Sequence, residues 1–380
     1  MSRIVRVEVG RYDYPVYGQF AKFLKPGPDG RVLRPTVLVR LTDDEGRSGW
    51  GQAVPVPTWA YETAETVEST IRLYLGRELL GLDPADIDEL HRRLERAVRP
   101  ALSTGQPICK AALDVACHDL KAKQQGVRVR DLWPGGRRET LTLSWTVAAA
   151  TLAEAEAQLE EGAGLGYRNF NIKVGAPQTP EYDLQLARTV REFAPDGFLW
   201  ADANTGYDVE TALAMAPKLA EIGVAVLESP LPPMELRGYQ ALKRQGALPI
   251  VMDEGIISPR ELREFIALGM LDGVAMKLAR TAGFAPAREI VTTLREEGLM
   301  VLGSGLTDPD LSLAATAHLY TWAEIDFPCA LNGPQFLRPA PFFEPLQVEG
   351  DVLRLPAGPG LGREPNDQVE SLMSVVAEAS

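Results

Sequence analysis

The stretch LWADANTGYD, residues 199–208, joins a short apolar run to a polar corner that leads into a helical segment. Asp and Asn favour such corners because their side chains bond nearby backbone, so an Asx turn at Asp202 is the ordinary interpretation. An acid at the end of a strand can also be a metal ligand. The choice depends on whether acids and lysines recur at matching places along the rest of the chain.

The alternation of an apolar run and a helical stretch repeats from about residue 140 onward. Helical periodicity follows each of seven runs, and an eighth short run, EIDFPCAL, ends the series. Seven strand–helix units and a final strand predict an α/β fold, a modified (β/α)7β barrel of the TIM type. An open doubly wound sheet is the competing interpretation, but no glycine-rich phosphate loop follows the first strand. The seven runs are LTLSWTV, FNIKVG, FLWADAN, VAVLESP, PIVMDE, GVAMKLA and MVLGSG.

The segments that flank the barrel predict a second domain. Residues 3–9 and 36–41 alternate like antiparallel strands, and residues 61–98 and 107–124 have helical periodicity. The last part of the chain returns to polar, strand-like sequence. We therefore expect an α+β capping domain of residues 1–135, completed by residues 345–380, over a barrel of residues 136–344.

Composition narrows the class of partner. The 380 residues carry a net charge of −13 without a long basic run, which argues against nucleic acid and anionic membranes. Cys109, Cys117 and Cys329 lack CxxC spacing and are typical of buried thiols in a reducing compartment. The N-terminal sequence has no apolar signal region, and no apolar run approaches the length of a membrane span. We expect a cytoplasmic protein.

Charged residues end five consecutive runs: Lys173, Asp202, Glu228, Asp253 and Lys277, with 24 to 29 residues between neighbours. That is about one strand–helix unit each time, and in such barrels the chemistry lies at the carboxyl ends of the strands. Three converging carboxylates would repel one another, and Mg²⁺, which takes oxygen ligands, resolves the repulsion. The register therefore favours a metal ligand at Asp202. With Glu228 and Asp253 it would hold one Mg²⁺, or Mn²⁺ as a substitute.

The two lysines lie on the strands on either side of the acidic trio. Burial and a neighbouring Mg²⁺ penalise an ammonium group, so either lysine could have a lowered pKa and act as a base. Mg²⁺ on a substrate carboxylate would stabilise the enediolate formed when the α-proton leaves. The alternative for each lysine is a structural salt bridge to a strand-end acid.

These residues and their contexts resemble the enolase superfamily, and within it the mandelate racemase/muconate-lactonizing group. NIKVG resembles its K-x-K strand, and VAMKLARTAGF its second lysine strand. DAN, LESPLPP and DEG resemble its three metal sites, AALDVACHDLKAKQQGVRVRDLWPGG the helix that leads into its barrel, and PGLG its tail. The resemblance covers nearly the whole chain and implies a capped barrel, Mg²⁺, a small carboxylate substrate and a homo-oligomer.

Lysines on both sides place the chain nearer the muconate-lactonizing branch. The other branch uses a His after the seventh strand, where this chain reads GSGLTDPDLS. His91, His118 and His318 lie in helical segments and are interpreted as structural.

Two positions depart from the family pattern. Asn171 replaces the first Lys of K-x-K, so Lys173 loses a cationic neighbour. Ala330 stands where CELFGP-type relatives carry an acid, with Glu324 and Asp326 as candidate replacements. Glu254 is a rival third metal ligand, although the family register favours Asp253.

Substrate specificity is expected from the loops of the cap. Tyr17, Phe20, Phe23, Trp59 and Tyr61 lie in the two regions that close such barrels, although core packing would explain them equally. As a lid they suggest a substrate with an apolar or ring portion. Near the strand ends, the candidate substrate-binding residues are Asn171, Asn204, Glu254 and Ser304.

Several functions remain open. The first hypothesis is an Mg²⁺-dependent isomerase, a racemase, epimerase or cycloisomerase, with lysine bases on opposite faces of the substrate. The second is a dehydratase of a hydroxy or sugar acid that uses the same intermediate. A metal-free Schiff-base aldolase at Lys277 leaves the three carboxylates unexplained, and the intact trio argues against a non-catalytic descendant.

Overall fold

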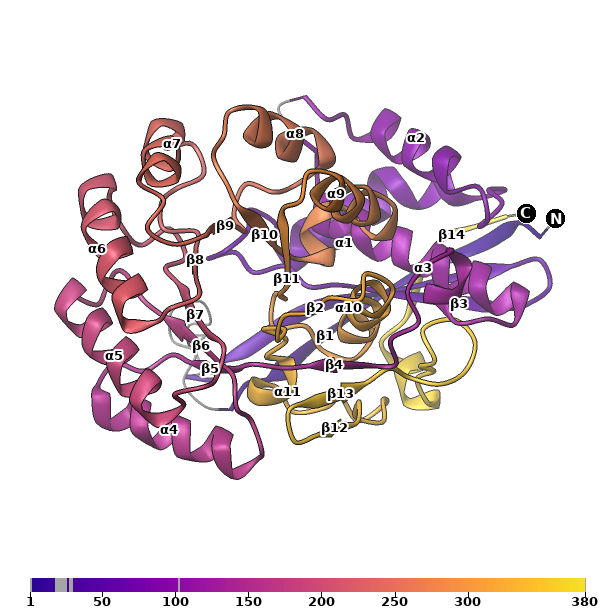
Figure 1. Ribbon diagram of the computed structural model, residues 1–380. Helices are drawn as coiled ribbons and strands as arrows, with labels where there is room; N and C mark the ends of the chain where they lie inside the picture. Colours follow the sequence, from indigo (N-terminus) through magenta and orange to yellow (C-terminus); the bar gives the residue numbers. More distant parts are fainter. Residues whose placement is uncertain (1, 18–25, 27–29, 102, 380) are drawn as a thin grey trace.

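The computed structural model describes residues 2–17, 26, 30–101 and 103–379 and consists of a capping domain and a curled parallel-sheet barrel (Figure 1). The two ends of the chain lie close together on the capping side (Figure 1). The predicted fold class, an α/β barrel with an α+β cap, is confirmed. No helix in these ranges is long and apolar enough to cross a membrane.

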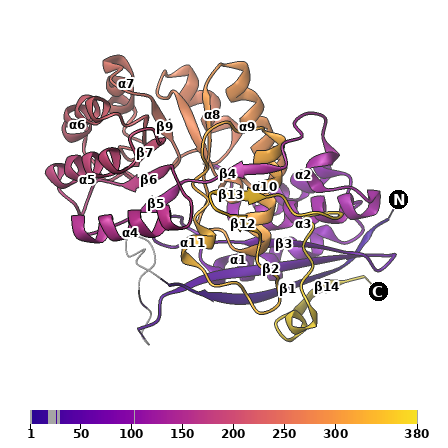
Figure 2. The same cartoon turned by 60° about the horizontal axis from the view of Figure 1, so that its bottom comes forward.

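The cap is built on an antiparallel sheet with the strand order β14-β1-β2-β3. β1 and β2 contain the two predicted strands, and β14 brings the end of the chain back to pair with β1. Figure 2 shows the long strands β1 and β2 running along one side of the barrel. The strands are β1 (Ile4–Pro15), β2 (Leu33–Asp43), β3 (Ser48–Ala53) and β14 (Ser374–Glu378).

Three helices cover this sheet. The periodic region 61–98 does not form one helix, because the chain leaves the α-helical path between Thr70 and Ile87. The helix α3 packs closely on β3 and carries the cap toward the barrel. The helical elements are α1 (Ala64–Thr70), η1 (Ile71–Leu75), η2 (Gly76–Leu79), α2 (Ile87–Ala97), α3 (Pro107–Gln125) and η3 (Val129–Leu132).

Seven parallel strands, in the order β11-β10-β9-β8-β7-β6-β5, form the barrel sheet. The predicted eighth strand is represented by two isolated bridges, Ser304 to Ala330 and Leu143 to Cys329, which connect β11 back toward β5. The Gln335 side chain bonds both backbone groups of Thr146 and supports this closure. The strands are β5 (Trp145–Val147), β6 (Phe170–Lys173), β7 (Leu199–Asp202), β8 (Val226–Glu228), β9 (Ile250–Met252), β10 (Gly273–Met276) and β11 (Met300–Gly303).

Helices follow each barrel strand, and α4 to α9 succeed one another around the sheet (Figure 1). A short 3-10 turn, η4 (Leu278–Thr281), follows β10 directly. The helices are α4 (Leu152–Gly164), α5 (Pro180–Phe193), α6 (Val209–Ile222), α7 (Leu236–Gln245), α8 (Pro259–Ala267), α9 (Phe284–Glu296) and α10 (Asp310–Trp322). The remaining elements are β4 (Thr140–Thr142), α11 (Gly333–Phe336), β12 (Val348–Glu349), β13 (Val352–Arg354) and η5 (Asp367–Ser371).

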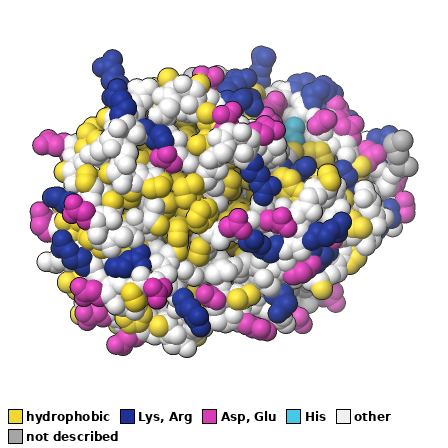
Figure 3. All heavy atoms as spheres, in the orientation of Figure 1, with side chains coloured by type: hydrophobic (Ala, Val, Ile, Leu, Met, Phe, Trp, Pro, Cys, Tyr) yellow, Lys and Arg dark blue, Asp and Glu magenta, His cyan; other side chains and the backbone are white. Residues whose placement is uncertain are grey.

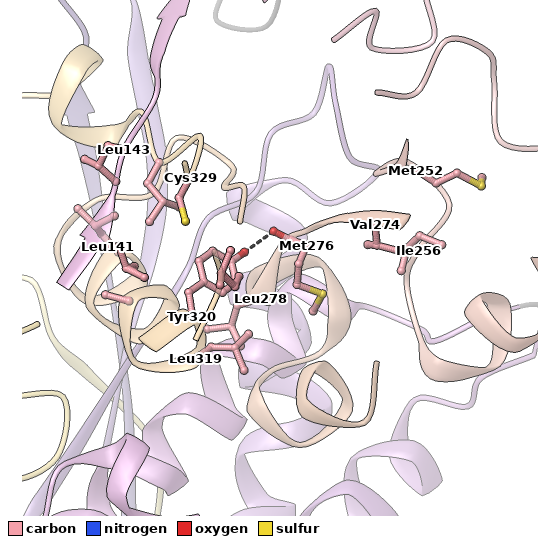
Figure 4. Packing of buried hydrophobic residues seen from close by; sticks show 14 of the residues in the cluster. Leu141, Leu143, Met252, Ile256, Val274, Met276, Leu278, Leu319, Tyr320 and Cys329 are labelled. Atoms are coloured by element: carbon pink, nitrogen blue, oxygen red, sulfur yellow. Dashed lines mark hydrogen bonds between the residues drawn. The ribbon is translucent and has the colours of Figure 1, made fainter. Parts of the chain in front are cut away.

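The barrel has an apolar core inside the sheet and a larger one between the sheet and its helices. Figure 4 shows part of the outer core, with Leu319 and Tyr320 of α10 lying beside Met276 and Leu278. Charged side chains cover much of the face in Figure 3, and hydrophobic side chains gather near its centre. The inner cluster consists of Trp200, Val226, Val251, Ala275, Leu302 and Ala330.

Candidate active site

Strand register places three of the predicted residues in one row. Lys173 on β6 pairs with Asp202 on β7, and Asp202 pairs with Glu228 on β8. Paired residues on neighbouring parallel strands point to the same face of a sheet, so these three side chains are direct neighbours. All three end their strands, as the sequence predicted.

Asp253 and Lys277 lie progressively further along their strands than this row. Val251 pairs with Glu228 and also with Gly273, so Asp253 lies two residues beyond the row and Lys277 four. This stagger is the shear of a closed barrel, and it brings Lys277 back over the acids. The Lys277 Nζ atom lies 3.0 Å from Asp253 Oδ2 and 3.8 Å from Glu228 Oε1. The structure therefore brings all five strand-end residues together.

Asp202 forms the Asx turn that the sequence suggested, whereas its role as a metal ligand stays a prediction. Its Oδ1 atom accepts a 2.9 Å hydrogen bond from the backbone N–H of Asn204, which is an Asx turn. Its Oδ2 atom accepts a 2.5 Å hydrogen bond from Lys173 Nζ. Asn204, Thr205 and Ser229 have left-handed backbones just after the two acids, and strain of this kind is typical of functional sites.

Arg280 is the functional candidate that sequence reasoning missed. It is 5% exposed and its guanidinium pairs with Asp253 Oδ1 at the bottom of the 3-10 turn η4. Its position three residues after Lys277, in an otherwise apolar turn, was the available signal. Arg280 leaves less of Asp253 free for a metal than the sequence suggested.

Trp59 reaches the site from the cap. Its ring centroid lies 4.8 Å from Lys277 Nζ and 5.8 Å from Lys173 Nζ, so one indole covers both ammonium groups. Its Nε1–H donates a 2.8 Å hydrogen bond to Glu254 Oε1, and Asn204 Nδ2 donates to the same oxygen at 3.3 Å. Glu254 is thus engaged with the lid and with Asn204.

Of the other predicted lid aromatics, the two that the structure describes do not join this cluster. Tyr61 is 61% exposed, and its hydroxyl donates toward the Thr104 carbonyl at 3.4 Å. Tyr17 donates to the Pro334 carbonyl at 2.9 Å and lines a separate cavity with Asp308 and Asp310. Phe20 and Phe23 lie outside the described residues.

The two departures from the family pattern leave neutral groups in the barrel. Asn171 is 1% exposed, and within the described residues neither atom of its amide has a hydrogen-bond partner. Ala330 belongs to the inner apolar cluster. The candidate replacement acids are engaged elsewhere: Glu324 accepts from the Arg137 backbone and Asp326 pairs with Arg138.

The three histidines lie outside the site. His91 and His118 both contact the buried carboxylate of Asp114, at 2.8 and 3.2 Å. His318 is completely buried on α10. Their predicted structural role agrees with these positions.

The buried charges shift several pKa values. Burial, with Asp202 beside it, raises the pKa of Glu228 well above its usual range. Burial also raises the pKa of Asp253, against the opposing effect of Arg280. Burial acts to lower the pKa of Lys173, but Asp202 and Glu228 outweigh it and the pKa is raised. This is opposite to the shift expected for a base, because the nearest neighbours of the lysine are carboxylates.

The donor set fits a divalent cation in its chemistry. Among the residues that the structure describes, no three His, Cys, Asp or Glu side chains converge closely enough to hold a metal ion, because Asp202 turns to Lys173 and Asp253 to Arg280. The four acids Asp202, Glu228, Asp253 and Glu254 nevertheless outnumber the three cations around them. Glu228 Oε1 accepts no hydrogen bond from the described residues. A divalent cation would neutralise this buried excess of negative charge.

Comparison with known proteins identifies the fold and the chemistry it supports. Residues 150–369 match the family description "Enolase C-terminal domain-like", and residues 31–133 match "Mandelate racemase / muconate lactonizing enzyme, N-terminal domain". The chloromuconate cycloisomerase CbnB of Cupriavidus necator is 31% identical over 83% of this chain and 84% of its own. The L-Ala-D/L-Glu epimerase of Bacillus subtilis (strain 168) is 26% identical over 95% of this chain and 96% of its own.

A solved structure agrees with these relatives. The crystal structure of 2-chloromuconate cycloisomerase from Rhodococcus opacus 1CP superimposes with a TM-score of 0.87 at 25% identity, covering 98% of this chain and 100% of that one. The capped barrel and these relatives define an isomerase of the enolase superfamily. The chain belongs to the mandelate racemase/muconate-lactonizing enzyme family, in its muconate-lactonizing branch.

Proposed function

We propose that this enzyme removes the α-proton of a carboxylate substrate and returns it, or completes a cycloisomerisation, with Lys173 and Lys277 as the proton-transferring groups. The observation that carries the proposal is the arrangement of the two lysines at opposite ends of a row of buried carboxylates, under one indole. A planar intermediate held between them would have one ammonium or amine facing each side.

The metal belongs to the proposal. Asp202, Glu228 and Asp253 would hold one Mg²⁺, for which Mn²⁺ could substitute. When bound, Mg²⁺ would stabilise the negative charge that develops on the substrate carboxylate as the α-proton leaves. Binding would also draw the carboxylates of Asp202 and Asp253 away from Lys173 and Arg280. Lys173 would then lose the carboxylate that favours its charged form.

The protein's own residues account for the rest of the reaction. Each lysine takes or gives one proton at its Nζ atom, on its own face of the substrate. Trp59 covers both Nζ atoms and keeps water from them. We further propose that Asn171, Asn204, Glu254 and the lid residue Trp59 supply contacts to the substrate.

The test is α-proton exchange in D₂O with Mg²⁺, using a library of acyl amino acids, dipeptides, sugar acids and cyclic acids. Wild type is compared with Lys173→Ala, Lys277→Ala and an EDTA-treated sample. We expect exchange that stops with EDTA, and loss of exchange at one face in each lysine variant. Formation of a keto acid without exchange would instead indicate a dehydratase, and exchange that survives both substitutions would refute the lysine assignment.

A further inference from the structure

The two lysines have different surroundings. Lys173 Nζ has the proposed metal ligand Asp202 as its hydrogen-bond acceptor. Lys277 Nζ donates a 2.6 Å hydrogen bond to the hydroxyl of Ser304 and also lies near Asp253 and Glu228. Of these neighbours, Ser304 is the one that is neither charged nor a proposed metal ligand. It therefore remains available to Lys277 while the carboxylates are engaged elsewhere.

A buried tyrosine fixes Ser304 from behind. The Tyr320 hydroxyl on α10 donates to the Ser304 carbonyl at 2.6 Å, and it also contacts the carbonyl of Met276, the residue before Lys277 (Figure 4). The backbone N–H of Ser304 donates to the Met276 carbonyl at 3.0 Å and points to the Tyr320 hydroxyl at 3.3 Å. One hydroxyl thus joins the backbone ends of β10 and β11 at the point where they carry Lys277 and Ser304.

The ring of Tyr320 can approach this closely because β11 ends in a glycine. A Cβ atom at Gly303 would lie 2.9 Å from the Tyr320 ring and 2.5 Å from Cys329 Sγ, distances that real Cβ contacts do not reach. Tyr320 is itself completely buried. The ring is therefore held between the strands and α10, and its hydroxyl has little freedom to leave the two carbonyls.

We infer that Ser304 and Tyr320 are positioning residues for the Lys277 half of the reaction, with Ser304 holding the Lys277 amine and Tyr320 holding Ser304. A lysine has a long, flexible side chain with many rotamers. A hydrogen bond from one N–H of its Nζ atom to Ser304 selects one rotamer and directs the other positions on Nζ into the site. Proton transfer is sensitive to such placement. The proton passes between Lys277 Nζ and the substrate, and Ser304 only accepts a hydrogen bond from that amine without taking a proton. Lys173 has no corresponding contact to α10.

The first test rests on the proposed function and compares the two faces within one protein. The enantiomer whose exchange is lost in Lys277→Ala reports the Lys277 face, and the other reports the Lys173 face. Ser304→Ala and Tyr320→Phe should slow exchange at the Lys277 face about 10-fold or more and leave the Lys173 face unchanged. Tyr182→Phe is the control, because it removes a tyrosine hydroxyl that donates to a backbone carbonyl, that of Ala149, at 2.8 Å. Equal slowing of both faces, or of neither, would overturn the inference.

The second test needs no substrate and separates this inference from the proposed function. Wild type and the same variants are treated with a limiting amine-acylating reagent, and mass spectrometry gives the ratio of Lys277 to Lys173 labelling. Ser304→Ala and Tyr320→Phe should change this ratio several-fold, whereas Tyr182→Phe should not. An unchanged ratio would overturn the positioning role even if exchange is observed. A changed ratio in a protein that exchanges no carboxylate would support the positioning role while refuting the proposed function.

Discussion

Arg280 offsets part of the negative charge of the buried acids. Its guanidinium pairs with Asp253, and its charge also acts on Glu254, whose pKa it helps to lower against the effect of burial. Removing one partner of a buried ion pair leaves an uncompensated charge, which typically costs about 3–5 kcal/mol. Arg280 is therefore important to the protein when no metal is bound, although it competes with a metal for Asp253.

We expect Arg280→Met to lower the free energy of unfolding in EDTA by about 3–5 kcal/mol. Mg²⁺ should restore part of this loss, since the freed acids bind the cation more strongly. Urea unfolding with EDTA and with Mg²⁺ measures both effects. Arg263→Met is the control, because Arg263 pairs with Glu289 in solvent, where a pair contributes about 1 kcal/mol at most. The same modest loss in both variants, without a larger Mg²⁺ effect in Arg280→Met, would contradict the prediction.

At the level of residues, the sequence predicted those site residues that lie at the ends of strands. Lys173, Asp202, Glu228, Asp253 and Lys277 were found because parallel strands end at one edge of a barrel. Arg280 was missed because it lies on the turn after a strand, where side-chain direction depends on local backbone angles. For Asp202 the Asx turn does not rule out a metal-ligand role, since only one of its two oxygens takes part in the turn.

Among the elements, α3 and β3 show how small residues permit a close contact. A Cβ atom on Gly51 would lie 2.0 Å from the Ala112 carbonyl oxygen, and one on Gly49 would lie 2.3 Å from that of Ala116. Both contacts are with helix backbone, which cannot rotate away as a side chain can. At these two positions β3 of the cap sheet thus packs directly on the backbone of α3, without intervening side chains.

Gly51→Ala should destabilise the protein by about 3 kcal/mol, because the helix must move away from the sheet. Gly164→Ala is the matched control: its Cβ would meet nothing within 4 Å on α4, and helix propensity favours alanine by up to about 1 kcal/mol. Thermal and urea unfolding of the two variants should therefore change in opposite directions. A loss in both, or in neither, would show that the close contact is not what limits this position.

The buried His318 on α10 makes the free energy of unfolding depend on pH. Burial lowers the pKa of His318 to about 4, whereas an unfolded histidine titrates near about 6.5. As pH falls through this window, the unfolded chain takes up a proton that the folded chain refuses. The stabilising effect of the neutral ring is thus present above about pH 6.5 and is lost toward pH 4.

Wild type should therefore lose roughly 3 kcal/mol more between pH 7 and pH 4 than His318→Gln, which has no titrating ring. The comparison uses the pH slope of unfolding free energy, so an overall difference in stability between the two proteins does not affect it. Parallel pH profiles would mean that the pKa of His318 is the same in the folded and the unfolded chain.

The elements themselves were predictable where their periodicity was long. The seven strand–helix units were found because each helix is long enough to show its apolar stripe. The eighth strand is reduced to isolated bridges at Cys329 and Ala330, and the backbone of Thr146 on β5 bonds the Gln335 side chain in place of a neighbouring strand. Region 61–98 has helical periodicity, but the helix is interrupted between Thr70 and Ile87. The sequence could not show this, because a periodic apolar pattern does not reveal where the backbone hydrogen bonds change from one helical type to another.

At the scale of the whole molecule, the cap is attached to one side of the barrel. Three buried polar residues of its sheet each bond residues 306–312, the loop after β11 together with the start of α10. Tyr14 donates to Asp310 at 2.7 Å, Gln52 accepts from Ser312 at 3.1 Å, and Arg34 donates to Leu306 at 2.8 Å. This loop begins just after Ser304. The Lys277 half of the site is therefore connected directly to the cap through Ser304 and its loop, which links lid placement to the residues that hold that base.

Arg34 is the centre of this attachment. It is completely buried, its pKa is lowered by burial to about 10, and it donates to the carbonyls of Pro35, Val54, Pro55 and Leu306. Val54 and Pro55 lead to Trp59, so this one guanidinium connects the lid segment to the barrel loop. Sequence reasoning could not find it, because Arg34 lies on an ordinary strand and its partners are backbone carbonyls, of which that of Leu306 lies 272 residues further along the chain.

Arg34→Met should lower the free energy of unfolding by about 3 kcal/mol or more, since several buried carbonyls lose their donor at about 1–3 kcal/mol each. Amide hydrogen exchange should accelerate specifically in residues 303–312 and in the segment that leads to Trp59. Arg191→Met is the matched control, because Arg191 also donates to four backbone carbonyls, those of Ala194, Pro195, Gly197 and Gly223, in a different part of the barrel. It should destabilise the protein without accelerating exchange in residues 303–312. If both variants accelerate that loop equally, general loosening explains the effect and Arg34 is not a specific link between the cap and the Lys277 side.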